Sequence, residues 1–409
     1  MKILIFEPDH TGHRFAYVGP ILPALAELGA GVTLVTTEAA RGTPEFQEHI
    51  GPHANGLTVD FQPAIDVSSP MKAARGKLEL FDSALARHRP EHLLSPSSDG
   101  LTQLLGARPS ARLPKGLEAE GCMHRGSYAY PAGSFKRRLM VGAGLMACNR
   151  SPWTIVHHVD VVAYEWLKRR GGSFAERSRL LADPVEHPAP IAHGDARRRL
   201  GIPEDGRYIG CAGVLDTRKG IDLLVRTFAE HVRDPHVRLL LAGRLAPDIR
   251  DLIQGACSDL VKSGRIVLID RFVTKDELHL ALSAMDLVVT PYPAHVGLSN
   301  IALRAAAAGR PILASDFGWL GLIVPRFGLG RTCRVRDVDD FARAMVRELD
   351  ATPSYVPGPA AARLLEFHSH PNFTACWTAR LRERLAVPAS PSYRTWEWVM
   401  AGLDAREAR

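Results

Sequence analysis

Cysteine is scarce in this sequence and is never closely paired. The six cysteines among the 409 residues lie far apart, and no two of them form a Cys-x-x-Cys motif. Zinc sites and disulfide frameworks need cysteines at short, regular spacings, so neither is predicted. We expect reduced thiols, several of them in apolar segments, in a cytoplasmic protein. The cysteines are Cys122, Cys148, Cys211, Cys257, Cys333 and Cys376.

Long apolar runs are also missing. No stretch approaches the ~18 consecutive apolar residues that are needed to span a bilayer. The N-terminal sequence MKILIFEPDHTGH is interpreted as a strand with its following loop, and not as a signal peptide. A membrane-spanning or secreted protein is therefore not expected.

The charge is modest and shows no strongly basic tract. The sequence has 51 Lys and Arg against 44 Asp and Glu, a formal net charge of +7 that is shared about evenly by its two halves. A nucleic-acid partner is not expected, because such proteins gather their cations on one face or tail. No G-x-G-x-x-G follows a predicted strand, and the nearest match, GLGRTC at 328–333, lacks the last glycine. This argues against a nicotinamide enzyme.

Apolar strands alternate with helical patterns along most of the chain. This alternation predicts an α/β fold with two Rossmann-like, doubly wound parallel sheets, and 409 residues suit two domains. The proline-rich segment 183–195 is the predicted linker between a first domain at 1–185 and a second at 186–375. A helix is predicted near 15–29, whereas 103–150 has no readable pattern. The predicted strands are KILIFEP at the N-terminus, 31–37, 57–61, 91–95, 154–158, 207–212, 237–242, 265–269, 286–290 and 311–315.

The segment 295–315, HVGLSNIALRAAAAGRPILAS, has the pattern of an anion-binding helix start. Ser299 or Asn300 can cap the helix, because a short polar side chain accepts hydrogen bonds from amides of the first turn. An alanine-rich body follows, Gly309 suits a left-handed closing residue, and a proline stops continuation. The amides near Leu298 and the positive helix end favour an anionic ligand, although a capped core helix remains an equal alternative.

A second segment, GVLDTRKGIDLL at 213–224, follows the predicted strand 207–212. Gly213 lets the backbone turn tightly past the strand end. Arg218 and Lys219 stand just before the next helix, where cations can bind phosphate oxygens. A solvated basic loop is the alternative for this pair alone. A cationic loop and an amide-rich helix start in one α/β unit together indicate a phosphate site.

These two segments resemble the donor half of the family 4 retaining glycosyltransferases, which have the GT-B fold. The family shows Gly-Arg-Leu, three further residues and Lys-Gly, and later two glutamates that run into an Ala-rich helix and Gly-x-Pro. The resemblance is specific over about 200–320. The positions that match are Gly213, Leu215, Lys219, Gly220, Ala305, Ala307, Gly309 and Pro311.

The sequence departs from the family at three of its characteristic positions. The arginine after the first glycine is Val214 here, with Arg218 as a nearby substitute. The two glutamate positions are occupied by Val296 and Arg304. The roles of those glutamates toward the sugar and the ribose are therefore not carried over. Arg304 lies one turn after Asn300 and is predicted to meet a nucleotide phosphate or a carboxylate of another loop.

The resemblance implies transfer of a sugar from a nucleotide-diphosphate sugar to an acceptor hydroxyl, with retention. Lys219, Arg218 and the helix start would stabilise the departing diphosphate, and no metal ion or other cofactor is expected. The co-substrate would be of the UDP or GDP type, and the acceptor a glycan, a lipid-linked intermediate or a small natural product. The GT-B fold further implies that C-terminal helices in 376–409 cross back to the acceptor-binding first domain.

Further donor contacts are predicted at strand ends of the second domain. Arg244 ends one strand, and Arg271 and Phe272 follow the next, where the family places its nucleobase contacts. Ordinary surface positions are the alternative for both arginines. The full predicted nucleotide-binding set is Gly12, Gly213, Arg244, Arg271, Phe272, Val296, Gly297, Leu298, Ser299, Asn300 and Arg304.

In the first domain, loops that follow predicted strands supply the acceptor-side candidates, since ligands of doubly wound sheets bind beyond the strands' carboxyl ends. His13 or Asp99 would orient the acceptor hydroxyl, and His158 is a third catalytic candidate. Each has an ordinary alternative as a turn residue, a helix cap or a core histidine. The other positions in these loops are Gly12, Ser98, Gly100, His157 and Asp160.

Two alternatives remain open. The segment 136–150, KRRLMVGAGLMACNR, joins a basic cluster to apolar residues and is interpreted as a buried packing helix, with docking on an anionic membrane as the second reading. For the whole protein, the missing glutamates leave room for a catalytically silent GT-B-like protein that binds a partner. A retained Lys219 argues against that second class.

Overall fold

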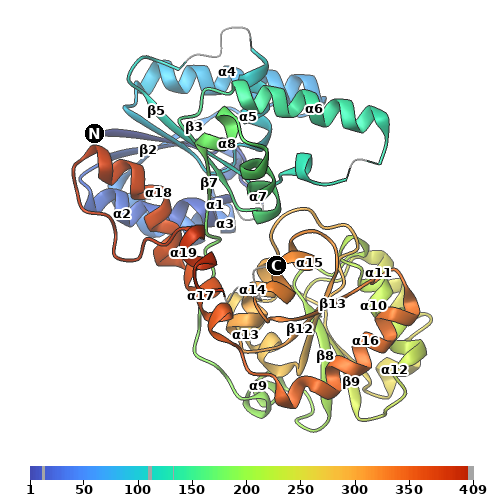
Figure 1. Ribbon diagram of the computed structural model, residues 1–409. Coiled ribbons are helices and arrows are strands. Elements are labelled where there is room, and N and C mark those ends of the chain that lie inside the picture. Colours follow the sequence, from blue (N-terminus) through green and yellow to red (C-terminus); the bar gives the residue numbers. More distant parts are fainter. Residues whose placement is uncertain (12–13, 109–112, 132, 404–409) are drawn as a thin grey trace. The chain divides into compact units, whose positions relative to one another are not determined.

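The computed structural model describes residues 1–11, 14–108, 113–131 and 133–403 (Figure 1). The chain divides into two compact units, each with its own parallel sheet. The first contains Met1–Pro184 and His370–Arg394, and the second contains Val185–Ser369 and the segment from Thr395 onward. The chain thus returns to the first unit at 370–394, and the described residues 395–403 belong to the second unit.

The first unit is built on a seven-stranded sheet in the order β3-β2-β1-β4-β5-β6-β7, with every neighbouring pair parallel. The strand order reverses between β1 and β4, so their carboxyl ends flank the switch point of the sheet. Two strands, β5 and β7, were not among the predicted ones. The strands are β1 Lys2–Phe6, β2 Gly31–Thr37, β3 Leu57–Gln62, β4 His92–Ser95, β5 Glu118–Met123, β6 Ile155–His158 and β7 Ser178–Leu180.

Helices cover both faces of this sheet, with α4, α5 and α6 on one face and α2 and α18 on the other (Figure 1). The single helix predicted near 15–29 is instead interrupted at Gly19–Ile21 by a 3₁₀ turn, because Pro20 and Pro23 lack amide protons. The helices are α1 Arg14–Val18, α2 Leu22–Glu27, α3 Pro44–His49, α4 Pro70–His88, α5 Asp99–Ala107, α6 Phe135–Arg150, α7 Val161–Arg170, α8 Ser173–Arg177 and α18 His370–Arg384.

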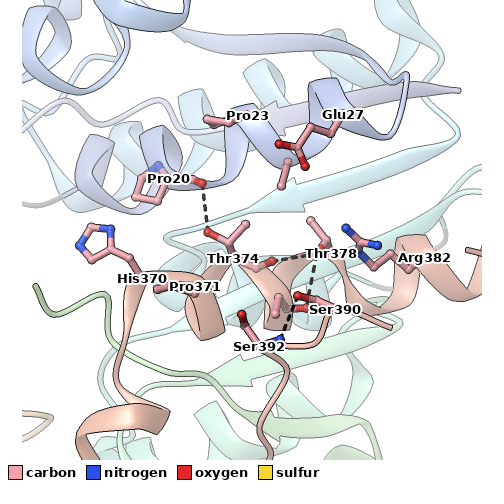
Figure 2. Close-up of a pocket in the computed structure, with 12 residues that line it drawn as sticks. Pro20, Pro23, Glu27, His370, Pro371, Thr374, Thr378, Arg382, Ser390 and Ser392 are labelled. Carbon is pink, nitrogen blue, oxygen red and sulfur yellow. Dashed lines mark hydrogen bonds between the residues drawn. The ribbon is translucent and has the colours of Figure 1, made fainter. Parts of the chain in front are cut away.

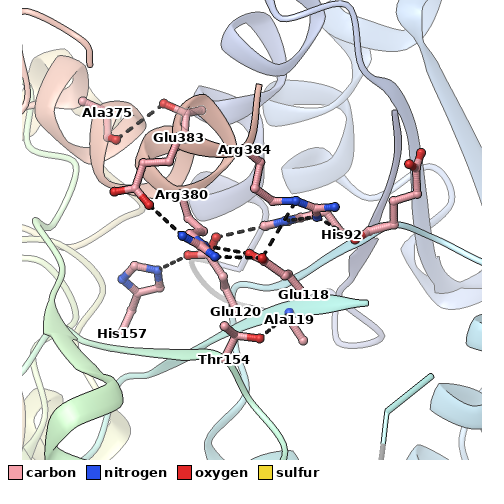
Figure 3. Close-up of polar contacts among 12 residues, drawn as sticks. His92, Glu118, Ala119, Glu120, Thr154, His157, Ala375, Arg380, Glu383 and Arg384 are labelled. Carbon is pink, nitrogen blue, oxygen red and sulfur yellow. Dashed lines mark hydrogen bonds and ion pairs between the residues drawn. The ribbon is translucent and has the colours of Figure 1, made fainter. Parts of the chain in front are cut away.

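Strand β5, with the sequence EAEGCM, escaped prediction because it places charged residues where an apolar strand is expected. Glu120 is buried, and its two oxygens accept hydrogen bonds from His92 Nε2 at 2.9 Å and His157 Nε2 at 2.7 Å (Figure 3). Glu118, on the same side of the strand, pairs with Arg380 of α18 at 2.7 Å (Figure 3). Partners from other strands and from the returning helix therefore stabilise an otherwise unfavourable strand.

The returning helix α18 also lies beside α2, and the two helices border a hollow of about 430 Å³ (Figure 2). Across it the Thr374 hydroxyl donates to the carbonyl of Pro20 at 3.0 Å. Glu27, His370 and Arg382 line its polar part (Figure 2). The hollow is thus a surface feature of the seam between α2 and α18, away from the carboxyl ends of β1 and β4.

Helix α6 corrects the interpretation of 136–150 as a buried helix. Cys148 is its only buried side chain among the described residues, although Val141 and Leu145 pack against the first core. Phe135 is 74% exposed and Met140 is 65% exposed. The helix therefore uses one narrow inward face for packing and leaves its other apolar side chains in solvent. No helix in the described parts of the chain is long and apolar enough to cross a membrane.

The second unit has a six-stranded parallel sheet in the order β10-β9-β8-β11-β12-β13. Five of these strands were predicted. The sixth, β13, lies within GLGRTC and was not predicted, because its glycines are unusual in a strand. Gly330 is needed there, since a methyl group on it would lie 2.0 Å from the carbonyl oxygen of Ile312 in β12. The strands are β8 Arg207–Ala212, β9 Val237–Ala242, β10 Ile266–Ile269, β11 Leu287–Thr290, β12 Ile312–Ser315 and β13 Gly330–Cys333.

Helix α10 shows how the second core forms. Its apolar residues recur at helical spacing, and Ile221, Leu224, Val225 and Phe228 are all buried, as the periodicity predicted. The helices are α9 His193–Leu200, α10 Ile221–His231, α11 Pro247–Gln254, α12 Ser258–Lys262, α13 Lys275–Ala284, α14 Asn300–Ala307, α15 Gly318–Arg326, α16 Val338–Ala351, α17 Pro359–Phe367 and α19 Trp396–Met400. All six cysteines of the chain are buried and free.

Candidate functional site

The candidate site lies at the switch point of the second sheet, where β8 and β11 are neighbours. In doubly wound sheets, the loops at the carboxyl ends of two such strands diverge and leave room for a ligand. The loop after β8 contains Gly213 and Lys219, and the loop after β11 leads through Tyr292 to helix α14. The two segments that predicted a phosphate site therefore meet at one edge of the sheet.

The first loop is held by backbone bonds to the neighbouring β9 loop. Gly213 has a φ of +101°, and Gly243 has a φ of +136°. A methyl group on Gly243 would lie 1.8 Å from the carbonyl oxygen of Gly213, so the two backbones touch. The amide of Gly213 donates to Ala242 at 2.9 Å, and that of Leu215 donates to Arg244 at 3.0 Å. The loop accordingly starts from a rigid base.

A short 3₁₀ turn, Thr217–Lys219, ends this loop. Asp216 caps it, since its carboxylate accepts the amide of Lys219 at 3.0 Å. Gly220 follows with a φ of +67°, and a methyl group there would lie 2.1 Å from the carbonyl oxygen of Pro291. Only glycine fits this contact, so a glycine is required at position 220, where the loops after β8 and β11 touch.

The Lys219 side chain turns back toward the start of α14. A methyl group on Gly213 would lie 3.4 Å from Lys219 Nζ and 3.4 Å from Ile301 Cδ1. The same Nζ stands 5.5 Å from the ring centre of Tyr292. Burial lowers the pKa of Lys219, and Arg218 adds to this effect. A half-buried cation with little water around it is well suited to an anionic ligand.

Helix α14 begins beside this cation. Ser299 is its cap, and its hydroxyl accepts the amide of Ala302 at 3.4 Å. Gly297 has a φ of +102°, which turns the chain into the helix. Val296 and Leu298 are partly exposed on this turn. Because the positive end of α14 and the Lys219 ammonium act in the same place, the geometry favours a diphosphate-sized anion.

Tyr292 forms the inner wall of the site. It is 2% exposed, and its hydroxyl is buried beside Ser299, the cap of α14. Burial raises the pKa of this phenol well above its usual value, so it stays protonated. A phenol that keeps its proton is a donor at the base of the loop that leads to α14.

Arg304 forms a hydrogen bond within its own helix. Its Nε donates to Asn300 Oδ1 at 2.6 Å, as expected for residues one turn apart. Arg304 as a whole is partly exposed. Arg304 thus lies within the first two turns of α14, on the same helix face as Asn300.

The remaining donor-side predictions fall outside this cluster. Arg218 is exposed and lies 3.4 Å from Asp216. Arg244 is exposed after β9, and the Phe272 side chain is 72% exposed. Arg271 pairs with Glu277 at 2.6 Å, which lowers the pKa of that carboxylate to about 2. Arg271 is therefore held at the start of α13, and no geometry links it to Lys219.

Most first-unit candidates have structural partners. Gly12 and His13 lie outside the described residues. Asp99 accepts the amides of His124 at 3.2 Å and Arg125 at 2.9 Å, so it ties down the loop after β5. His158 is buried, with Tyr128 at 3.2 Å and Ser178 at 3.0 Å on its two ring nitrogens. Burial lowers its pKa to about 3, which is the behaviour of a neutral core histidine.

Sequence reasoning missed Glu7, which directly follows β1 at the switch point of the first sheet. Its side chain is fully buried, and Oε2 has no hydrogen-bond partner among the described residues. Burial raises its pKa to about 7, although Arg14, at 3.6 Å, acts in the opposite direction. Asp9 stands beside it and pairs with Lys77 at 3.0 Å. A carboxylate at the end of an otherwise apolar strand was the available signal.

Comparison with known proteins identifies the second unit. Residues 206–351 match the family model described as glycosyl transferases group 1. This part of the second unit is similar to group 1 glycosyl transferases. Among curated relatives, the D-inositol 3-phosphate glycosyltransferase of Mycolicibacterium smegmatis is 28% identical over 206 residues, covering 47% of this chain and 45% of the relative. The chain spans less than half the length of the first curated relatives that it matches.

Solved structures resemble nearly the whole chain and show its GT-B fold. Sucrose-phosphate synthase from Thermosynechococcus elongatus gives a TM-score of 0.69 at 21% identity, covering 94% of this chain and 99% of that one. HepE of Anabaena, solved in complex with UDP, gives a TM-score of 0.66 at 16% identity, covering 94% and 100%. The predicted α/β class with two Rossmann-like sheets is therefore confirmed.

Proposed function

We propose that this protein transfers a sugar from a nucleotide-diphosphate sugar to an acceptor hydroxyl, with retention and without a metal ion. One observation carries the proposal. The Lys219 ammonium, poorly hydrated and close to Gly213, stands beside the start of α14 at the switch point between β8 and β11. A cation and a helix end that converge on one point match the charge of a diphosphate.

The proposed chemistry follows from the charges that develop. As the bond between the sugar carbon and the diphosphate oxygen breaks, that oxygen takes the electron pair and becomes negative. Lys219 and the positive end of α14 stabilise this oxygen more strongly in the transition state than in the bound donor, which lowers the barrier. The acceptor oxygen then forms the new bond to the sugar carbon and releases its proton to the departing phosphate.

On the acceptor side, Glu7 is a better candidate than Asp99. Both oxygens of Asp99 already accept backbone amides. Glu7 keeps one oxygen without a partner, and its pKa of about 7 lets it accept or donate a hydrogen bond near neutral pH. We propose that Glu7 orients the acceptor hydroxyl, whether the acceptor is a glycan, a lipid-linked intermediate or a small natural product. His13 stays a candidate from the sequence.

A UDP-type donor is the first choice. HepE of Anabaena, which shares the fold, was solved with UDP and with UDP-glucose, which supports this base over the others. The test is thermal unfolding of the full chain with UDP, GDP, ADP and dTDP and their sugars. A ligand at a hundred times its Kd adds roughly 2.7 kcal/mol to the free energy of unfolding, which gives a clear rise in Tm.

Lys219→Ala is the decisive variant, and Arg218→Ala is the matched control in the same turn. We expect Lys219→Ala to abolish the nucleotide-dependent rise in Tm and the transfer activity while its own Tm stays near that of the wild type. Arg218→Ala should keep most of the rise, because Arg218 is exposed. Transfer activity of Lys219→Ala within tenfold of the wild type would show that the diphosphate assignment is wrong.

A catalytically silent GT-B protein is the second candidate, and one observation favours it. Val296 and Arg304 occupy the two positions where the family pattern that the sequence resembles has glutamates. Such a protein would bind a nucleotide without turnover, or none at all. A rise in Tm with UDP together with no release of UDP from any UDP-sugar, with or without added acceptors, would favour this second function.

A further inference from the structure

Helix α6 has two apolar faces, and only one of them is used inside the protein. Its inward face presents Val141, Leu145 and Cys148 to the first core. Packing there is tight, because a methyl group on Gly106 of α5 would lie 1.7 Å from the carbonyl oxygen of Ala147. The helix is thus held firmly against α5, and Figure 1 shows it running along the outer side of the first unit.

The outward face is apolar as well. Phe135 is 74% exposed, Leu139 is 61% exposed and Met146 is 59% exposed. At about 100° per residue, these three side chains fall within about 40° of one another on the helix surface. Gly142 and Ala143 lie between them and are also exposed, so nothing polar interrupts the stripe. We name Phe135, Leu139 and Met146 the outer stripe.

Positive charge borders the outer stripe. Lys136, Arg137, Arg138 and Arg150 belong to the same helix and are exposed. The sixteen residues of α6 contain no aspartate or glutamate. An apolar stripe flanked only by cations is complementary to a surface that is apolar below and anionic above, as the headgroup region of an anionic bilayer is.

We propose that α6 docks this protein on an anionic lipid surface, with the outer stripe entering the interface and the basic residues binding lipid phosphates. This surface is separate from the nucleotide site, and its proposal does not depend on the proposed transfer reaction. Docking through α6 brings the first unit to the lipid surface.

The test is co-sedimentation of the full chain with vesicles of phosphatidylglycerol and phosphatidylcholine in a ratio of about one to two. Vesicles of phosphatidylcholine alone are the lipid control. We expect binding only to the anionic vesicles, and loss of binding near 1 M salt, where charges are screened beyond about 3 Å. The nucleotide-dependent rise in Tm reports on the other site and should not change.

Two variant pairs separate the apolar and the charged contributions. Phe135→Ser with Leu139→Ser should lower vesicle binding at least tenfold, whereas Val67→Ser with Met71→Ser, equally exposed in the same unit, should not. Arg137→Glu with Arg138→Glu should lower it about 25-fold or more, since each cation contributes roughly fivefold. Arg226→Glu with Arg233→Glu makes the same change in net charge on the exposed surface of the second unit and should have little effect.

Three results would overturn the proposal. The first is no binding to anionic vesicles, and the second is equal binding to both kinds of vesicle. The third is a wild-type dimer in sedimentation velocity that the Phe135→Ser and Leu139→Ser pair converts to a monomer, since a second copy of the chain would then cover α6. Unchanged Tm values of the variants exclude misfolding as the reason for lost binding.

Discussion

Arg380 on α18 and Glu118 on β5 form a two-point ion pair, in which the Nε and Nη2 atoms of the arginine lie 2.7 and 2.8 Å from the two carboxylate oxygens (Figure 3). The two residues are 262 positions apart in the chain. The pair fixes the end of the returning helix onto the first sheet. The fold of the first unit therefore depends on a segment that comes after nearly all of the second.

The first prediction concerns this pair. A double-mutant cycle of Arg380→Met and Glu118→Gln, measured by urea unfolding, should give a coupling free energy of about 1 kcal/mol, since two-point pairs that are partly exposed lie at the upper end of surface ion pairs. The cycle of the exposed pair Arg75 and Glu79 on α4 is the control and should give less. A coupling near zero would show that α18 is held by its apolar contacts alone.

The second prediction concerns Glu120. Burial alone would raise its pKa, but hydrogen bonds from His157 and His92 outweigh it and lower the pKa to about 2. Because the folded pKa is below the usual 4.5, the charged group stabilises the fold above pH 4.5, and this stabilisation is lost as the pH falls toward 2. Glu120→Gln should lower the free energy of unfolding by roughly 3 kcal/mol at pH 7 and by much less near pH 3.

The measurement for Glu120 is urea unfolding at both pH values. Glu79→Gln on the exposed side of α4 serves as the control and should change little at either pH. A loss of stability that is the same at pH 7 and pH 3 would contradict the assigned ionisation of Glu120.

The third prediction concerns Glu7, whose pKa is shifted in the opposite direction to that of Glu120. Burial raises the pKa of Glu7 from 4.5 to about 7, so the folded protein binds a proton there more tightly than the unfolded chain does. Stability from this group is full below pH 4.5 and declines as the pH rises through about 7. Glu7→Gln, which imitates the protonated acid, should therefore raise the free energy of unfolding at pH 8 by up to about 3 kcal/mol and change it little at pH 4.5.

The same Glu7 variant tests its role toward the acceptor. If Glu7 orients the acceptor hydroxyl, Glu7→Gln lowers kcat or raises the KM for acceptor while the rise in Tm with UDP is kept. A variant that gains stability at pH 8 and transfers sugar at the wild-type rate would leave Glu7 a structural residue only.

The fourth prediction concerns Arg304. Arg304→Glu puts a negative charge one turn into α14 and removes the hydrogen bond to Asn300. If Arg304 faces a nucleotide phosphate, UDP binding should weaken about tenfold or more, a loss of about 1.4 kcal/mol. Titration calorimetry measures this, with Arg304→Gln as the uncharged comparison. Tighter binding by Arg304→Glu would show instead that the side chain at this position meets a ribose.

Local patterns along the chain predicted most of the second unit, although not β13. The spacing of Ile221, Leu224, Val225 and Phe228 predicted α10, and Ser299 was recognised as a cap from its type and place. In the first unit the same reasoning failed at β5, because two glutamates interrupt the apolar run that is expected of a buried strand. Their partners, His92, His157 and Arg380, come from three distant parts of the chain.

The sequence by itself determined ten of the thirteen described strands, the cap at Ser299, and that Lys219-Gly220 and the α14 start belong to a phosphate-binding pattern. These properties depend on neighbours within a few residues. Only the tertiary structure decided that Lys219 lies beside Gly213 and Ile301, that Asp99 and His158 have structural partners, and that Glu7 is buried with an unpaired oxygen. It also decided that α6 faces solvent, because burial and pKa depend on contacts between segments far apart in the chain.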